Sequence, residues 1–395
     1  MKPTVRMIPF LKRTTKSRTG GFGRIGSCTL VFFSLTLLTG CGSGGGRGTM
    51  QMGGAIQGTA LNLSRTVTTL AGTANLKGST DGTGAAARFD NPCQITTDGT
   101  TLYVADRSNH AIRKIVIATS EVTTLAGTAG QSGSTDGTGA AARFNAPEGI
   151  TTDGTSLYVA DSWNNTIRKI DIVTGEVTTL AGTAGQSGST DGTGVAARFN
   201  DPCQITTDGM TLYVADRDNH TIRKIDIVTG DVTTLAGTAG QSGSMDGTGA
   251  AARFYLPEGI TTDGMNLYVA DSGNDTIRKI DIVTGDVTTL AGTAGDPGFM
   301  DTDEPPGTRQ PKFTNPIGIT TDGTSLYAAD TWNDTIRKVV IATGDVTTPA
   351  GLATDPGSAD GTGNAVRFNM PWGVTTDGTN LYVADRFNNT IRKIR

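Results

Sequence analysis

Two cysteine–histidine pairs are the residues of this sequence best suited to chemistry. Cys93 precedes His110 by the spacing that also separates Cys203 from His220, and these are the only histidines in the chain. Thiolate and imidazole groups are common ligands of zinc and other transition metals. The four residues are therefore candidate metal ligands. The alternative is that ordinary turn and wall residues were duplicated together.

Two glutamates repeat at the same interval as these pairs. Glu148 and Glu258 each follow a proline, as Cys93 and Cys203 do. A pair of carboxylates is the usual acid–base equipment of glycosidases. No nucleophile or oxyanion-binding device accompanies the two glutamates. The sequence therefore predicts no catalytic residue.

Large aromatic and basic side chains occur near the same positions of the repeated pattern. Such side chains could stack on a sugar or a peptide, or they could cover the ends of sheets. The candidate binding face consists of Arg107, His110, Glu148, Trp163, Arg217, His220, Glu258, Trp332, Trp372, Arg386 and Phe387.

One repeated unit positions all of these residues. Its LYVAD aspartate recurs every 55 residues, except for one interval of 59, at Asp106, Asp161, Asp216, Asp271, Asp330 and Asp385. A fixed period of this length indicates one supersecondary unit per repeat. GITTDG, LYVAD, TIRKIDI and VTTLAG are short runs rich in Val, Ile, Thr or Tyr, bounded by Gly, Asp or Asn. They predict four strands in each unit.

The two ends of the repeat region predict a closed ring. VTTLAG occurs at Val67 before the first complete unit, whereas the sequence stops at Arg395, where the last unit needs its fourth strand. If the first strand completes the last unit, no edge is left unpaired. Pro349, within the sixth such strand, fits an outer edge. The predicted fold is all-β, a six-bladed β-propeller of four-stranded blades closed by the N-terminal strand.

The turn after LYVAD and the start of the first strand share one end of such a blade. The six copies differ mainly there, which predicts that this end contacts a partner; drift at exposed turns is the alternative. Asp106 and Arg113 recur in every copy and predict a structural bond. Equivalent positions two blades apart exceed the ~7 Å Cα limit for a disulfide, so none is expected between Cys93 and Cys203.

The repeat carries a family resemblance. PxGITTDGTxLYVADxxNxTIRKID resembles the NHL repeat, and the link GSxDGxGxxARFNxP is typical of its bacterial and teneurin-like members. The resemblance covers residues 66–395 and implies the propeller fold. Similarity to the zinc-dependent peptide-amidating lyases, which use histidines around the channel mouth, raises the idea of a metal site. Propellers host many unrelated activities, so the resemblance fixes no function.

The N-terminal residues have the layout of an export signal. Residues 1–40 carry seven basic side chains and no acidic one, and end in an apolar run followed by small residues. Leu38-Thr39-Gly40-Cys41 resembles the lipobox of bacterial lipoproteins, which makes Cys41 the predicted lipidation site; an ordinary secretory signal is the alternative. The predicted domains are a signal peptide (1–40), a Gly-rich lipid-anchored tether (41–65) and the propeller (66–395).

Charge restricts the partners of the mature chain. Subtracting the seven basic groups of the signal from 33 leaves 26 against 37 acidic groups, a balance of −11. This balance argues against nucleic-acid binding. We expect a monomer in the cell envelope, anchored in the outer membrane if the host has one. The leading hypothesis is a non-catalytic lipoprotein, without cofactor, whose propeller face binds a protein, peptide or glycan. The alternative is a metal-dependent lyase or lactonase with its site at the channel mouth.

Overall fold

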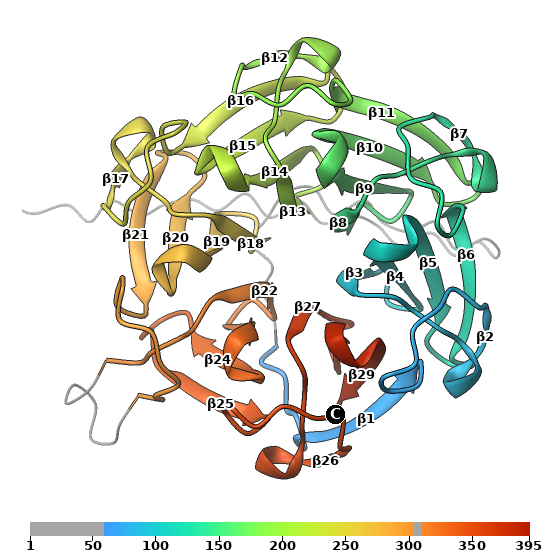
Figure 1. The fold of residues 1–395 in the computed structure, drawn as a ribbon. Helices are drawn as coiled ribbons and strands as arrows, with labels where there is room; N and C mark the ends of the chain where they lie inside the picture. The colour runs from blue at the N-terminus through green and yellow to red at the C-terminus, as the bar shows by residue number, and fades with distance from the viewer. Residues whose placement is uncertain (1–58, 303–309) are drawn as a thin grey trace, which may run out of the picture. The chain divides into compact units, whose positions relative to one another are not determined.

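The computed structural model describes residues 59–302 and 310–395, which form six antiparallel sheets around a central axis (Figure 1). The predicted signal (1–40), Cys41 and the tether up to residue 58 lie outside the described residues. No helix in the described ranges is long and apolar enough to cross a membrane.

Each sheet is one blade with four main strands, as the sequence predicted. From the axis outward the blades are β3 (Pro92–Thr97), β4 (Thr101–Asp106), β5 (Ala111–Val116), β6 (Glu121–Gly127); β8 (Pro147–Thr152), β9 (Ser156–Asp161), β10 (Thr166–Asp171), β11 (Glu176–Gly182); β13 (Pro202–Thr207), β14 (Thr211–Asp216), β15 (Thr221–Asp226), β16 (Asp231–Ala236); β18 (Pro257–Thr262), β19 (Asn266–Asp271), β20 (Thr276–Asp281), β21 (Asp286–Ala291); β22 (Pro316–Thr321), β23 (Ser325–Asp330), β24 (Thr335–Val340), β25 (Val346–Ala350); and β27 (Pro371–Thr376), β28 (Leu381–Asp385), β29 (Thr390–Ile394), β1 (Thr66–Ala71).

Five blades gain a short outer strand that the sequence analysis missed. In the loop that enters each of these blades, one Gly-Thr dipeptide pairs with the blade's fourth strand. These short strands are β2 (Gly82–Thr83), β7 (Gly137–Thr138), β12 (Gly192–Thr193), β17 (Gly247–Thr248) and β26 (Gly361–Thr362). In the described residues of the fifth blade no such strand is assigned, although the N–H of Thr302 donates to the carbonyl of Val346 at 3.0 Å. Pro349 lies in β25, the fourth strand of this blade. A missing N–H is least costly at an edge.

Ring closure follows the prediction. β1 pairs with β29, with Val67 opposite Ile394 and Thr68 opposite Lys393. Before β1, Ser64 Oγ donates to the carbonyl of Arg395 at 2.8 Å. The N–H of Leu61 donates to Asp322 Oδ2 at 3.0 Å. The first described residues thus complete the sixth blade and also bind the fifth.

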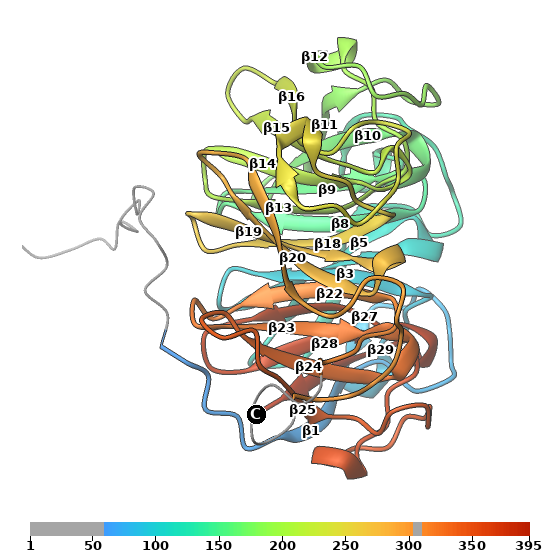
Figure 2. The same cartoon turned by 90° about the vertical axis from the view of Figure 1, so that its left-hand side faces the viewer.

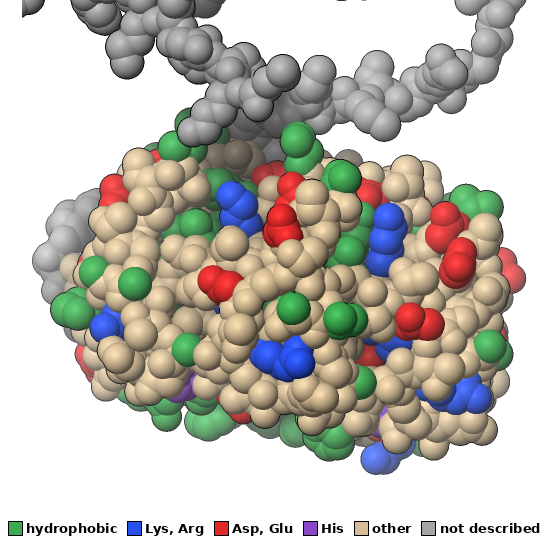
Figure 3. Space-filling view, turned by 90° about the horizontal axis from the view of Figure 1, so that it is seen from above, with side chains coloured by type: hydrophobic (Ala, Val, Ile, Leu, Met, Phe, Trp, Pro, Cys, Tyr) green, Lys and Arg blue, Asp and Glu red, His purple; other side chains and the backbone are tan. Residues whose placement is uncertain are grey.

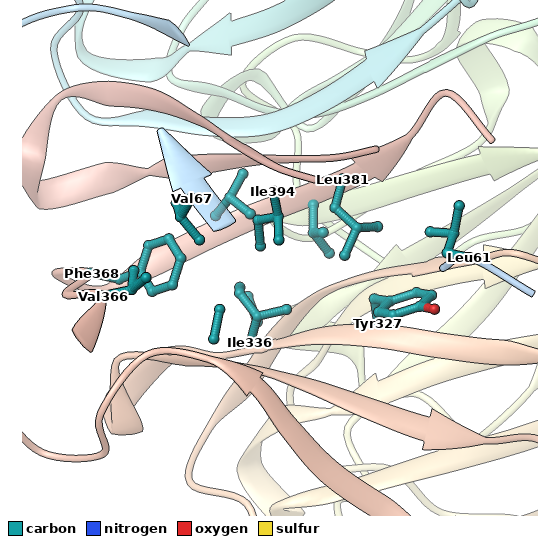
Figure 4. Packing of buried hydrophobic residues seen from close by; sticks show 12 residues of the cluster. Leu61, Val67, Tyr327, Ile336, Val366, Phe368, Leu381 and Ile394 are labelled. Carbon is teal, nitrogen blue, oxygen red and sulfur yellow. The ribbon is translucent and has the colours of Figure 1, made fainter. Parts of the chain in front are cut away.

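The hydrophobic core lies between the blades. Leu102 and Val104 of β4 pack toward the sixth blade, whereas Tyr103 and Ala105 pack toward the second. Side chains alternate across a strand with period 2, so a run that is apolar at every position serves both neighbours. Figure 4 shows one such layer, between the fifth and sixth blades, where Val67 and Ile394 face Ile336 and Tyr327.

The inner strands approach one another closely enough to form the channel wall. A Cβ on Gly259 would lie 1.8 Å from the carbonyl oxygen of Ile317 in the next blade, and one on Gly149 would lie 2.2 Å from that of Cys203. Glycine is therefore required at these points because neighbouring backbones occupy the space of a side chain.

Candidate binding site at the channel mouth

A short 3₁₀ turn after the second strand of each blade forms one face of the ring. The first strand of each blade begins at this face too, because Pro92 pairs with Asp106 and its equivalents do the same. We call this the turn face. Its 3₁₀ turns are η2 (Arg107–Asn109), η4 (Ser162–Asn164), η6 (Arg217–Asn219), η8 (Ser272–Asn274), η9 (Thr331–Asn333) and η11 (Arg386–Asn388).

A buried ion-pair network fixes each turn. Asp106 accepts hydrogen bonds from Arg113 and Asn109, both at 2.8 Å. Arg113 also reaches Asp81 at 2.8 Å and stacks over the Phe89 ring at 5.2 Å. The Asp–Arg bond recurs in all six blades, which confirms its predicted structural role. Asp81 is thus a second, half-exposed partner of the buried arginine. Asp301 takes its place in the fifth blade, a residue that the repeat pattern alone did not reveal.

The channel wall at this face has an acidic half and an apolar half. Glu148, Cys203 and Glu258 come from three successive inner strands, β8, β13 and β18. Cys203 Sγ lies 3.4 Å from Glu148 Oε2 and 3.9 Å from Glu258 Oε2. On the other three blades, Cys93, Ile317 and Trp372 form a buried apolar cluster. Both cysteines are free and buried, as expected for wall residues without a disulfide.

Burial controls the protonation of this wall. Burial raises the pKa of Glu258 to about 7, although Arg217 and Arg386 oppose the shift. Burial also raises the pKa of the Cys93 thiol to about 12 and that of Cys203 well above its usual value. At neutral pH both cysteines are therefore thiols, which are poor metal ligands compared with thiolates.

The three arginines at the start of turns make different contacts. Arg107 Nε donates to Glu148 Oε1 at 2.6 Å, and its guanidinium lies over the Trp163 ring at 5.1 Å. Arg386 stacks on Trp372 at 3.8 Å and has no ion-pair partner among the described residues. Arg217, in contrast, pairs with Asp201 and Asp218. Asp201 is a member of the site that the sequence analysis missed.

The two histidines have a backbone role. His110 and His220 adopt positive φ angles of 54° and 58° at the ends of their turns. The Nδ1 atom of His110 accepts a hydrogen bond from the N–H of Ala146 at 3.0 Å, and that of His220 accepts from Leu256 at 3.2 Å. Asn165 makes the same bond to Asp201 in the second blade. Within residues 59–302 and 310–395, no group of three or more His, Cys, Asp or Glu side chains is placed to hold a metal ion.

Aromatic side chains project from the turn face. Trp163, Trp332 and Phe387 occupy the second position of their turns and are 56%, 59% and 47% exposed. Trp372 instead lies in the wall and is 9% exposed, with its Nε1 unpartnered. Tyr255, which the sequence analysis missed, is 42% exposed. It fills the space beside Gly273, where a Cβ would lie 2.5 Å from its ring.

The fold and its closure define the class: a six-bladed β-propeller with short turns at one mouth of its channel. In its repeats the chain is similar to proteins named for NHL repeats, which agrees with the resemblance seen in the sequence. It is 30% identical over 323 residues to the protein SUPPRESSOR OF QUENCHING 1, chloroplastic, of Arabidopsis thaliana, covering 78% of this chain and 30% of that protein. It is 29% identical over 339 residues to human NHL repeat-containing protein 2, covering 76% of this chain and 46% of that protein. The chain thus spans less than half the length of these relatives. No protein-family model matches it.

Solved structures share the fold. A protein of unknown function from Bacteroides thetaiotaomicron superposes with a TM-score of 0.62 at 24% identity, over 83% of this chain and 75% of that one. An auxiliary nutrient binding protein from Bacteroides ovatus gives a TM-score of 0.62 at 20% identity, over 85% and 77% of the two chains. At these identities the likeness shows the architecture alone.

Proposed function

We propose that the propeller is a non-catalytic binding module whose turn face holds a protein, peptide or glycan. The observation that carries this proposal is the set of exposed aromatic rings on the turn face, around a wall with unpartnered buried polar atoms. Aromatic side chains supply much of the binding energy in protein interfaces. Trp372 Nε1, Arg386 Nε and Gln204 Nε2 are buried without a hydrogen-bond partner in the described chain, and a ligand could satisfy such groups.

The nutrient-binding function of two solved neighbours agrees with a binding role, since it shows that this architecture can serve one. The part of the outer rim seen in Figure 3 offers little for nucleic acid. Figure 3 looks onto the outer rim of the ring, where acidic and basic side chains are interspersed among uncharged ones and no large basic field is visible.

We further propose that the chain is a monomeric envelope lipoprotein anchored through Cys41. The described chain enters the propeller at the face opposite the turn face, because Leu61 bonds Asp322 in the turn between β22 and β23 (Figure 2). A chain that enters at that face leaves the turn face free for a partner. Metabolic labelling with a radioactive fatty acid tests the anchor; label that persists in a Cys41→Ser variant would contradict it.

Replacing Trp163, Trp332 and Phe387 together by alanine should weaken partner binding by at least a hundredfold, because loss of a central aromatic costs about 2 kcal/mol or more. The partner is captured from envelope extract by the purified protein and its affinity is measured by surface plasmon resonance. Val173→Ala, Val228→Ala and Val283→Ala serve as the control, since these exposed side chains lie in the β10–β11, β15–β16 and β20–β21 turns at the opposite face. Equal binding by both triple variants would place the site elsewhere.

The metal-dependent lyase or lactonase is the second candidate. It requires Cys93, His110, Cys203 and His220 as ligands, yet the two histidines already bond backbone N–H groups through Nδ1. Elemental analysis of the purified protein distinguishes the candidates, since a stoichiometric transition metal would favour the enzyme.

A further inference from the structure

Duplication of a two-blade unit gives the molecule two versions of one cation site. In the first version, Glu148 in the channel wall holds the guanidinium of Arg107 at 2.6 Å. The ring of Trp163, 5.1 Å away, covers that guanidinium. Carboxylate and aromatic ring together form a familiar environment for a guanidinium group. The chain itself supplies the cation here.

The second version keeps the carboxylate and loses the cation. Glu258 lies 110 residues after Glu148, and Arg217 lies 110 residues after Arg107. Arg217 does not reach Glu258, because it pairs with Asp201 and Asp218. These two acids stand where the first version has Asn91 and Ser108.

Glu258 is consequently buried without a cation bonded to it, although Arg217 and Arg386 lie close enough to act on it electrostatically. It is 7% exposed, and its one polar contact among the described residues is the long approach of Cys203 Sγ at 3.9 Å. A buried carboxylate without a partner is costly, and proteins seldom retain one without a ligand or a proton to neutralise it. In the second version the Glu258 carboxylate thus has no bonded cation of the chain, unlike Glu148 in the first.

An aromatic ring also remains at the second version. Gly273 replaces Trp163 in the turn, and the ring of Tyr255 fills the space that a side chain on Gly273 would take. Tyr255 also packs edge-on against His220, with ring centroids 5.7 Å apart. An exposed aromatic ring thus lies at the place in the second version that corresponds to Trp163 in the first.

From these contacts we infer that Glu258, with Tyr255 at its rim, binds an alkylguanidinium or alkylammonium group of the ligand. The inference rests on the proposed binding function and specifies the chemistry that the turn face recognises. The cation takes the place that Arg107 occupies beside Glu148. The cationic group belongs either to a free small cation or to a basic side chain of a peptide. Titrating the protein with a ligand of each kind distinguishes these two sources.

Binding should weaken as the pH falls. The pKa of Glu258 is raised to about 7, so below this pH the carboxyl is increasingly neutral and attracts a cation less. Burial raises the pKa of Asp201 to about 6, and its protonation would release Arg217 toward Glu258, which acts in the same direction. We expect about tenfold weaker binding at pH 6 than at pH 8. The groups facing Glu258 are Cys203, Arg217, Glu148, Arg386 and Asp201.

The test is calorimetric titration of the purified protein with ethylguanidinium, and with a short arginine peptide beside its citrulline counterpart. We expect the arginine peptide to bind and the neutral citrulline peptide to bind at least tenfold more weakly. Ethylguanidinium binding as tightly as the peptide would identify a free small cation as the ligand, and much weaker binding would identify a peptide side chain. Equal affinity of the arginine and citrulline peptides overturns the inference.

Two variants make the test specific to this position. Glu258→Gln should reduce binding at least tenfold. Asp201→Asn with Asp218→Ser restores the sequence of the first version, so Arg217 should occupy Glu258 and block the ligand while the carboxylate remains. Thermal unfolding verifies that both variants fold. Unchanged binding in the second variant overturns the inference even if Glu258→Gln fails to fold. If partner capture survives both variants but needs the exposed aromatics, the proposed function stands and the cation site falls.

Discussion

Replacing Asp161 by alanine should lower the free energy of unfolding by about 3–5 kcal/mol, because it leaves a buried arginine without its main partner. Asp161 is fully buried and accepts hydrogen bonds from Arg168 at 2.9 Å, Asn164 at 2.7 Å and the N–H of Asn145 at 2.7 Å. Burial raises its pKa to about 6, so it remains largely ionised at neutral pH. Chemical denaturation followed by tryptophan fluorescence measures the loss.

Two controls separate the buried bond from the exposed one. Asp136, the other partner of Arg168, is about half exposed, so Asp136→Ala should cost about 1 kcal/mol. Adding Arg168→Met to Asp161→Ala should recover part of the loss, because it removes a buried charge that has lost its buried partner. A loss below about 1 kcal/mol for Asp161→Ala would show that the Asp–Arg bond does not hold the turn.

The sequence was sufficient for the fold because its information is local and repeated. Strand positions follow from short runs between turn residues, and the need for β1 in the last blade follows from a strand at Val67 that has no blade of its own. The Asp106–Arg113 bond was predictable for a related reason: six equivalent pairs cannot all be active sites. The two-residue outer strands were missed because a Gly-Thr pair carries no hydrophobic pattern.

The site was less predictable because it depends on how far individual side chains reach. Arg107 with Glu148 and Arg217 with Glu258 look identical in the sequence, yet only the first pair forms a bond. The sequence feature that distinguishes the two arginines is the pair of acidic residues Asp201 and Asp218, which compete with Glu258 for Arg217. The backbone role of His110 and His220 could also have been recognised, since Asn or Asp stands at this position in the other four turns and tolerates positive φ.

Removing residues 59–71 should destabilise the ring more than any single substitution. The deletion removes the ladder between β1 and β29, exposes β29 as an unpaired edge and takes Val67 and Ala71 out of the core. Each buried valine contributes about 1.5–3 kcal/mol and each ladder hydrogen bond about 0.5–1.5 kcal/mol. The expected loss is on the order of 5–10 kcal/mol, comparable to the whole stability of a typical domain. Loss of the cooperative thermal transition, seen by circular dichroism, is the expected result.

Returning the strand at the other end of the chain tests whether pairing with β29 is what matters. The N–H of Arg395 donates to the carbonyl of Thr66 at 2.9 Å, so β1 could follow β29 directly through a tight turn. We expect that residues 66–71, placed after Arg395 through a copy of the turn 281–286, restore most of the lost stability, because the sixth blade is then built like the other five. Failure to recover would show that residues 59–65, which tie the fifth blade through Leu61 and Asp322, contribute more than the strand itself. The Leu61→Ala substitution in the full-length chain tests the contribution of residues 59–65 separately. If it lowers the free energy of unfolding far less than the deletion does, the pairing of β1 with β29 is the main interaction that closes the ring.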